Sequence, residues 1–250
     1  MKNSGQGESH YLTDRGLHGH VLTLTEQPTT LAGTVFSAGS LLLPLTDTDG
    51  DITGGQLVSP GGMKCLLPGS QLGGSFIALS GIPATPPEQV IITEGIATAL
   101  TTSLLSAGWV IAAVAATNLL RTAEKIRQKW PDTRIVLAGD NDLLDGKENT
   151  GRLWAEKAAK AVNGWVTLPP IRHKADWDDF RQENGLERAR EAFRDEMTWH
   201  GKGQTRLPEG FRLTREYLWY DKLVNKSDGD TEIRNIKISS PIRVTAITSD

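Results

Sequence analysis

The sequence predicts an α/β protein whose centre is a parallel β-sheet with helices on both faces. Three observations support this prediction. Between residues 89 and 168, short β-branched runs alternate with helical segments. Residues 40–82 consist of short apolar runs separated by turns, which is typical of a small antiparallel β meander. Strand-like runs return after residue 205, so a short β-rich tail is expected to follow the sheet.

The composition is that of an ordinary globular protein. The chain has 250 residues, of which 38% are hydrophobic and 23% charged. It lacks a run of about 18 apolar residues, the length that a membrane span needs, and MKNSGQGESH lacks the pattern of a signal peptide. We therefore expect a cytoplasmic location and no membrane partner. Cys65 is the only cysteine, which argues against an internal disulfide and a multi-cysteine zinc site, so no zinc is expected.

Composition divides the chain into four regions. Residues 1–39 are a polar segment with little periodicity, and residues 205–250 are the β-rich start of a C-terminal domain. Between them lie the β meander, residues 40–82, and the predicted catalytic domain, residues 88–200, which is preceded by a proline-rich linker. The strands expected in the meander are Leu41–Leu45, Gln56–Val58, Lys64–Leu67 and Ser75–Leu79. In the tail, strands are expected within Phe211–Tyr220 and Thr231–Thr248.

The α/β unit is expected to hold strands and helices in strict alternation. Asn118 is a predicted N-cap residue, Gly108 a predicted C-cap, and Pro131 closes the second helix. Short connections of this kind imply right-handed crossovers, and ligands of such sheets bind at the carboxyl ends of the strands. The predicted strands are Gln89–Thr93, Trp109–Ala115, Arg134–Ala138 and Gly164–Leu168; the predicted helices are Ile96–Ser106, 118–130 and Gly151–Val162.

Acidic residues follow three of these strands. Glu94-Gly95 follows the first strand, Asp140-Asn141-Asp142 the third, and Asp176–Asp179 lies in the loop after the fourth. Carboxylates that are crowded together repel one another unless a cation neutralises them, and oxygen ligands suit Mg²⁺ or Mn²⁺. Each feature alone is also compatible with a turn and a helix cap. Their combination at one edge of the sheet predicts a metal site.

At these residues the chain resembles a known family. IITEGIATAL, AGDND and KADWDDF are similar to the motifs of the Toprim family, which bacterial primases, topoisomerases and some nucleases share. The likeness is greatest to the primase-like Toprim proteins of phages, plasmids and integrated mobile elements. The shared features are Asn118-Leu119, Asn149–Arg152, Asp176–Asp179 and the meander itself, so the resemblance covers about residues 40–197.

The resemblance implies a role for each acidic residue. Glu94 is expected to act as general acid or base, and Asp140, Asp142 and Asp176 are expected to hold Mg²⁺ or Mn²⁺. Further candidates are Asp178, Asp179, Lys64 and Gly95. Lys64 could contact a phosphate from the meander, or could be solvated at a hairpin end; the residues leave both possibilities open.

The function that the resemblance implies is Mg²⁺-dependent nucleotidyl transfer by a DNA primase-like protein, in the replication of a mobile element or phage. The expected partners are a single-stranded DNA template, nucleoside triphosphates and a helicase, which would be a separate protein or a C-terminal region missing from this chain. Two alternatives remain: a Toprim nuclease that cleaves phosphodiesters, and a non-catalytic adaptor that binds nucleic acid or a helicase. A topoisomerase is disfavoured because Tyr11, Tyr217 and Tyr220 all lie outside the Toprim unit.

Overall fold

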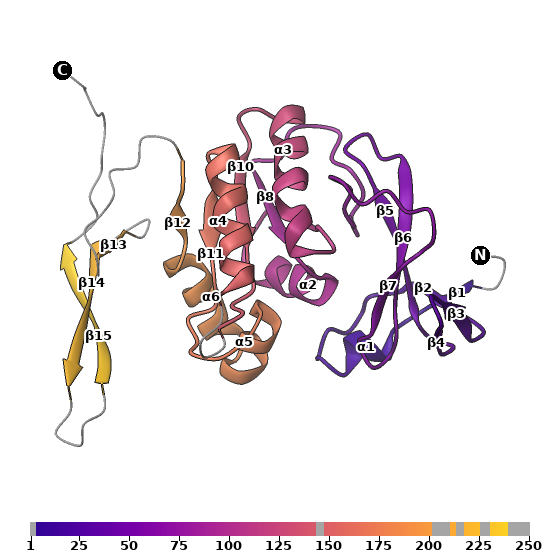
Figure 1. The fold of residues 1–250 in the computed structure, drawn as a ribbon, viewed down its shortest axis with the longest axis horizontal. Helices are drawn as coiled ribbons and strands as arrows, with labels where there is room; N and C mark the ends of the chain where they lie inside the picture. Colours follow the sequence, from indigo (N-terminus) through magenta and orange to yellow (C-terminus); the bar gives the residue numbers. More distant parts are fainter. Residues whose placement is uncertain (1–3, 144–147, 202–210, 214–217, 226–230, 240–250) are drawn as a thin grey trace.

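The computed structural model describes residues 4–143, 148–201, 211–213, 218–225 and 231–239. An antiparallel sheet lies on one side of a central α/β unit, and a C-terminal group of strands lies on the other (Figure 1). The predicted fold class is confirmed: the central sheet is parallel except at one edge, and helices cover both of its faces. The division of the chain into four domains stays a prediction.

The antiparallel sheet has the strand order β1-β2-β5-β6-β7. Its central strand β5 alternates buried and more exposed residues, which places Leu41, Leu43 and Leu45 in the core. The expected meander is present as β5, β6 and β7, whereas β1 and β2 extend the sheet into the polar segment before residue 40. These two strands join through backbone pairing while most of their side chains stay partly exposed. Strand β1 (SGQG) has no apolar residue, and the alternation of leucine and threonine in β2 covers only four residues. The bounds are β1 (Ser4–Gly7), β2 (Leu22–Thr25), β5 (Leu41–Thr46), β6 (Ile52–Val58) and β7 (Lys64–Leu66).

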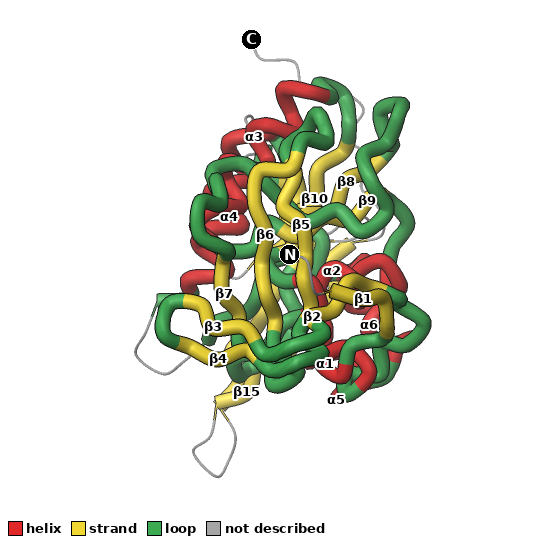
Figure 2. Tube along the Cα trace, turned by 90° about the vertical axis from the view of Figure 1, so that its right-hand side faces the viewer, coloured by secondary structure: helices red, strands yellow, loops and turns green. Residues whose placement is uncertain are grey.

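Two short elements complete the N-terminal region. Helix α1 (His10–Thr13) buries Tyr11 and Leu12 against the antiparallel sheet. Strands β3 (Thr29–Leu31) and β4 (Thr34–Phe36) form a separate two-stranded sheet. Seen from the antiparallel sheet, β5 and β6 run across the front of the α/β unit (Figure 2).

The central sheet has the strand order β12-β11-β10-β8-β9. Four strands are parallel, and β12 pairs antiparallel with β11 at one edge. In β8 and β10 nearly every residue is buried, as expected of strands covered on both faces. The bounds are β8 (Gln89–Thr93), β9 (Trp109–Ala112), β10 (Arg134–Ala138), β11 (Trp165–Thr167) and β12 (Thr198–Trp199).

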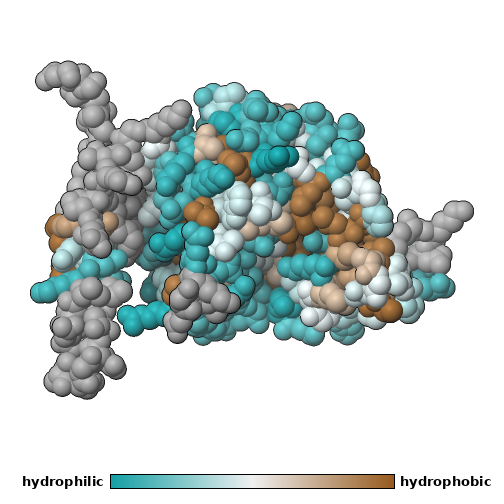
Figure 3. All heavy atoms as spheres, viewed as in Figure 1, coloured by the Kyte–Doolittle hydropathy of each residue, from teal (hydrophilic) through white to brown (hydrophobic). Residues whose placement is uncertain are grey.

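Helices pack on both faces of this sheet. On one face, α3 and α4 bury residues such as Ile126 and Ala158 against the strands. On the other face lie α5 and α6 together with α2, which also contacts the antiparallel sheet. Apolar surface gathers where that sheet meets the α/β unit, whereas the face that carries α4 is mostly polar (Figure 3). The bounds are α2 (Ile96–Leu105), α3 (Leu119–Lys129), α4 (Thr150–Val162), α5 (Trp177–Asn184) and α6 (Leu186–Asp195).

The predicted strand Ser75–Leu79 is instead a link between the two sheets. Phe76 exchanges backbone hydrogen bonds with Thr46 of the antiparallel sheet, at 2.8 and 2.9 Å. Ile77 does the same with Ala112 of β9, at 2.9 and 3.0 Å. Consecutive residues of an extended chain point their backbone groups in opposite directions, so this segment bonds one residue to each sheet and forms no ladder of its own.

Two predictions at the end of β9 are wrong in detail. The strand stops at Ala112 rather than Ala115, because Val114 has a φ of 74°, which a strand cannot contain. Asn118 does not cap α3 with its side chain, since a 3₁₀ turn (Ala116–Asn118) precedes that helix. The buried Asn118 amide accepts a hydrogen bond from the Gly74 N–H at 2.8 Å and donates to the Ser75 and Ala113 carbonyls.

The tail forms the antiparallel strands β13 (Phe211–Leu213), β14 (Leu218–Asn225) and β15 (Thr231–Ser239). Residues 214–217 of the first predicted strand segment and residues 240–248 of the last lie outside the described residues. None of the helices in the described part of the chain is long and apolar enough to cross a membrane.

Candidate active site

Glu94 and Asp140 lie at the carboxyl ends of adjacent parallel strands. Glu94 directly follows β8, and Asp140 follows β10 after Gly139; Thr93 and Ala138 pair at the last position of the two strands. The chain leaves β8 toward β9 on one side and later enters β10 on the other side. Ligands of open α/β sheets bind at such a switch point, because the loops diverge there and leave a crevice.

Backbone contacts hold Glu94 in place. Its carbonyl accepts a hydrogen bond from the Val114 N–H at 2.8 Å, and its partly buried carboxylate accepts one from the Ala116 backbone. Burial is the main cause that raises the pKa of Glu94 above its ordinary value, and Asp142 adds to the increase. Lys64, the Ala116 N–H and Lys174 oppose it. The carboxyl group is therefore poised to bind a proton more readily than a solvated glutamate.

Asp140 is the most strongly perturbed of the acidic residues. Its Oδ1 is buried and has no hydrogen-bond partner among the described residues. Burial raises the pKa of Asp140 well above its ordinary value, and Glu94, Asp176 and Asp142 raise it further, while Lys64 lowers it. A buried carboxylate oxygen without a partner is costly in a metal-free protein. A cation bound next to this oxygen would lower that cost, because it would neutralise the neighbouring carboxylates.

The side chain of Asp142 is hydrogen-bonded to the first turn of α4. Its Oδ2 accepts a hydrogen bond from the Gly151 N–H at 2.9 Å, and its own N–H donates to Asn149 Oδ1 at 3.0 Å. Asn149 also caps α4 by accepting from the Arg152 N–H. A Cβ on Gly151 would lie 2.2 Å from the Asp140 carbonyl oxygen, so the Asp-x-Asp loop can approach this helix only at a glycine.

Asn141, between the two aspartates, ties their loop to the segment before α5. Its backbone exchanges hydrogen bonds with Ala175, both at 2.9 Å, and its amide donates to the Ile171 carbonyl at 2.7 Å. Asn149 in turn donates to Asn141 Oδ1 at 2.6 Å. Lys174 and Asp176, which flank Ala175 in the chain, are thereby held close to Asp140 and Asp142.

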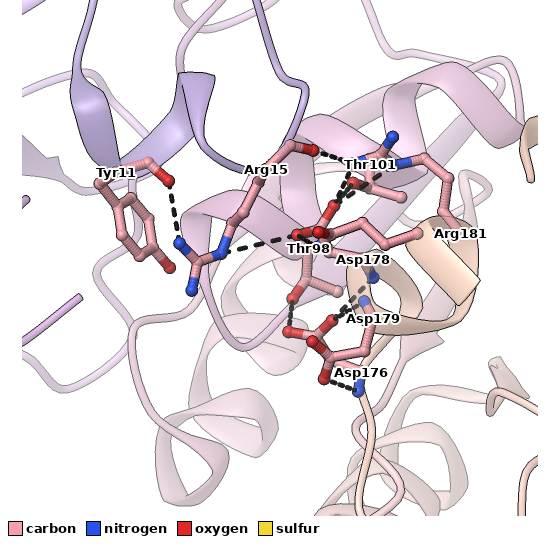
Figure 4. Close-up of polar contacts among 9 residues, drawn as sticks. Tyr11, Arg15, Thr98, Thr101, Asp176, Asp178, Asp179 and Arg181 are labelled. Atoms are coloured by element: carbon pink, nitrogen blue, oxygen red, sulfur yellow. Dashed lines mark hydrogen bonds and ion pairs between the residues drawn. The ribbon is translucent and has the colours of Figure 1, made fainter. Parts of the chain in front are cut away.

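Asp176 serves as the N-cap of α5. Its Oδ1 accepts from the N–H groups of Asp178 and Asp179, at 2.7 and 2.9 Å, and its Oδ2 accepts from the Thr98 hydroxyl at 2.9 Å (Figure 4). Asp179 completes a capping box by accepting from the Asp176 N–H at 3.0 Å. Asp176 lies near enough to Asp140 to raise the pKa of that group. Both of its carboxylate oxygens are nevertheless already hydrogen-bonded within the protein.

Asp178 belongs to a different network. Its side chain is only 1% exposed and lies 2.8 Å from Arg181 and 3.6 Å from Arg15 (Figure 4). The Thr101 hydroxyl donates to Asp178 at 2.7 Å, and Gln182 donates at 2.9 Å. These contacts assign Asp178 to an ion-pair network that joins the α1 region to α2 and α5. The metal role of Asp176, and the inclusion of Asp178 and Asp179 as further site residues, stay predictions.

Two lysines from separate elements flank the acidic residues. Lys64 reaches over from β7, and its Nζ lies 3.2 Å from where a Cβ on Gly95 would stand. Gly95 therefore leaves room for a lysine from the other sheet. Lys174 forms an ion pair of 2.8 Å with Asp142 Oδ1, and the nearby carboxylates raise its pKa, Asp142 most of all. Sequence reasoning missed Lys174, although it stands two residues before Asp176 in KADWDDF.

The carboxylate oxygens of the site suit a divalent cation, but in the described part of the chain they are not arranged as a complete set of metal ligands. Among the residues that the structure describes, no three His, Cys, Asp or Glu side chains are grouped as a metal site would require. Two of the candidate ligands already have partners within the protein, because Lys174 is paired with Asp142 and Asp176 caps α5. The Asp140 oxygen that has no partner among the described residues lies next to other carboxylates and has the chemistry of a Mg²⁺ or Mn²⁺ ligand.

The acidic residues of this site lie in a part of the chain that matches a known protein family. Residues 89–187 match the family described as Toprim domain. The chain is 32% identical over 163 residues to the DNA primase TraC of Escherichia coli, covering 64% of this chain and 14% of that protein. A second DNA primase TraC of Escherichia coli is 30% identical over 131 residues, or 51% of this chain and 9% of that protein. This chain thus corresponds to a small part of either relative.

A likeness to solved structures was also found. The primase fragment of the bacteriophage T7 primase-helicase protein is similar with a TM-score of 0.47 and 15% identity, over 72% of this chain and 66% of that chain.

Proposed function

We propose that this primase-like Toprim protein, whose Toprim domain spans residues 89–187, is a metal-dependent nucleotidyltransferase that joins nucleotides on a DNA template. The observation that carries the proposal is the placement of Glu94 beside Asp140 at adjacent strand ends of the matched domain. One group there is suited to proton transfer, and the other is a carboxylate that lacks a partner among the described residues. Nucleotidyl transfer needs a group that accepts the proton of the attacking hydroxyl and a carboxylate that can bind a divalent cation.

Each of these residues has a separate role in the proposed reaction. Glu94 accepts the proton of the attacking hydroxyl, because its raised pKa brings it closer to the working pH than an ordinary glutamate. Asp140 and Asp142, with Asp176 as a further candidate, would hold Mg²⁺, which when bound neutralises the charge of the triphosphate. Lys64 adds positive charge from the meander side, where a phosphate oxygen of the incoming nucleotide would meet its ammonium group.

The setting that we propose is the replication of a mobile element or phage, together with a helicase. The shared motifs and the 32% identity to a DNA primase support this setting. Residues 91–200 carry fifteen basic and sixteen acidic side chains, a balance that predicts weak and strongly salt-dependent binding of single-stranded DNA by the chain alone.

A primer-synthesis assay tests the proposed chemistry. Glu94→Gln should abolish the incorporation of labelled nucleotides on a single-stranded template with Mg²⁺ or Mn²⁺, because glutamine cannot accept the proton. Its affinity for the ion should change little, since most ligands remain. Glu124→Gln on the exposed surface of α3 is the matched control and should retain full synthesis. If Glu94→Gln still made primers at the wild-type rate, the assignment of Glu94 would be wrong.

The metal assignment has its own test. Calorimetric titration of the wild type with Mn²⁺ should show binding that is lost in the Asp140→Asn, Asp142→Asn double variant, because two anionic ligands are removed. Unchanged binding in the double variant would contradict the assignment. Metal-dependent cleavage of DNA without synthesis would favour the nuclease. Neither activity, even with a helicase supplied, would favour the adaptor.

A further inference from the structure

The ammonium group of Lys174 lies beside the Asp142 carboxylate, where a metal ion bound to Asp142 would have to lie. Its Nζ lies 2.8 Å from Asp142 Oδ1, while Asp142 Oδ2 accepts the Gly151 N–H at 2.9 Å. Both oxygens of Asp142 are thus engaged, whereas Asp140 Oδ1 has no partner among the described residues. A divalent ion bound by Asp140 could also use Asp142 Oδ1 only by displacing the lysine.

The lysine is placed so that it can leave without unfolding the site. The backbone next to it is fixed, because Ala175 exchanges two hydrogen bonds with Asn141 at 2.9 Å. The Lys174 side chain itself is 64% exposed and ends in a flexible four-carbon stem. An ion pair with such an exposed partner is weak and easily exchanged. Displacement therefore needs a change of side-chain rotamer and no movement of the loop.

The electrostatic surroundings support the same view. Asp142, Asp140 and Glu94 all raise the pKa of Lys174, so its ammonium group lies in the field of three carboxylates. Lys64 is the second lysine of the site and lies beside Gly95, but no ion pair of Lys64 is found among the described residues. Lys174 and Lys64 therefore differ in one testable respect: Lys174 is bound directly to a predicted metal ligand.

We propose that Lys174 is a resident cation that competes with the divalent ion for Asp142 and, once displaced, binds the triphosphate of the incoming nucleotide. This inference rests on the proposed function. It accounts for the ion pair of 2.8 Å that engages Asp142 Oδ1 beside the other carboxylates. It also makes metal binding and nucleotide binding cooperative, because the ion releases the side chain that the triphosphate uses.

The first test is a pair of calorimetric titrations on the full chain. Lys174→Met should bind Mn²⁺ more tightly than the wild type, by about fivefold or more, because the competitor is removed. At saturating Mn²⁺ the same variant should bind adenosine 5′-(α,β-methylene)triphosphate more weakly, by a similar factor. Lys64→Met, the matched control, removes a charge near the site without breaking the Asp142 ion pair. Its gain in Mn²⁺ affinity should be clearly smaller.

The second test follows Lys174 directly. Labelling by an amine-reactive reagent, quantified by mass spectrometry, should increase at Lys174 when Mg²⁺ is added to the wild type, because the ion pair is exchanged for a free side chain. In Asp142→Asn, labelling should already be high without Mg²⁺. Lys129, which contacts Asp49 far from the site, should show no response to the ion.

The outcomes separate this inference from the proposed function. If the wild type binds Mn²⁺ but Lys174→Met binds it no more tightly than Lys64→Met, or Mg²⁺ leaves the labelling unchanged, the role of Lys174 is refuted and the metal site stands. If the wild type binds neither ion, the proposed function and this inference both fail. Opposite changes in metal and nucleotide affinity in Lys174→Met would support the competition.

Discussion

At the scale of single residues, Asp140 is the acidic residue of the site whose pKa is raised most strongly by its surroundings. Its Oδ1 is buried without a partner among the described residues, and three other carboxylates act on it. The pKa of Asp140 is therefore higher in the folded protein than in the unfolded chain. A group of this kind stabilises the fold fully below its unfolded pKa, and this contribution is lost as the pH rises through the folded pKa.

Asp140→Asn should accordingly stabilise the metal-free protein at high pH. In EDTA at pH 8, we expect a gain of roughly 1 kcal/mol or more in the free energy of unfolding, since one unit of pKa corresponds to about 1.4 kcal/mol. At pH 4 the gain should be smaller, because protonation of a carboxyl group whose pKa is raised relieves the repulsion. Urea denaturation at both pH values measures the difference. Asp14→Asn on the exposed surface is the control, and a pH-independent difference for Asp140→Asn would contradict the repulsion argument.

At the scale of elements, the start of α4 shapes the Asp-x-Asp loop. Three interactions meet there: the Asn149 cap, the Gly151 N–H on Asp142, and the close approach of Gly151 to the Asp140 backbone. The N-terminus of a helix carries a partial positive charge, which favours the nearby carboxylate. The helix thus positions Asp142 and compensates part of its charge.

Replacing Gly151 should disturb this junction. In Gly151→Ala the new Cβ would lie 2.2 Å from the Asp140 carbonyl oxygen, so the loop or the helix must shift. We expect a loss of roughly 2–4 kcal/mol in the free energy of unfolding, as for other overpacked or strained positions. Gly61→Ala is the matched control, because the nearest atom to its Cβ would be 3.9 Å away. Equal urea midpoints for the two variants would show that the junction tolerates the added carbon.

At the scale of the whole molecule, the apolar packing of α2 holds the antiparallel sheet against the α/β unit, and two of the polar connections are central to the site. One is the extended segment around Phe76 and Ile77, which bonds to both sheets and is anchored by Asn118. The other is the buried Asp178, which is shared between Arg15 from the N-terminal region and Arg181 of α5. These connections bring Lys64 of β7 to the acidic residues of the other sheet.

The buried network around Asp178 should therefore matter more than an ion pair on the surface. Asp178→Ala leaves Arg181 and Arg15 without their shared anion, and we expect a loss of about 3–5 kcal/mol in the free energy of unfolding. Glu187→Ala removes an exposed ion pair with Arg190 of 2.7 Å and should cost less than about 1 kcal/mol. Urea denaturation compares the two variants. Similar losses would mean that burial adds nothing to the Asp178 network.

Much of the fold could be predicted because its signals are local in the sequence. The buried runs of β8 and β10 and the segments of α2 and α4 are each specified by neighbouring residues. The N-terminal strands and the link at Phe76 could not be predicted in the same way. Their backbone partners are distant in sequence. Strand β1 has no apolar residue, and the alternation in β2 is only four residues long.

The sequence by itself determined the α/β unit and the presence of Glu94 and Asp140 at its carboxyl edge, because strand ends can be located from local periodicity. Only the tertiary structure decided which atoms are engaged: Asp142 by Lys174, Asp176 by the α5 cap, and Asp178 by two arginines. The physical reason is that a hydrogen bond or ion pair depends on distances of a few ångströms between side chains. Those distances are set by how separate segments pack, and spacing along the chain does not contain them.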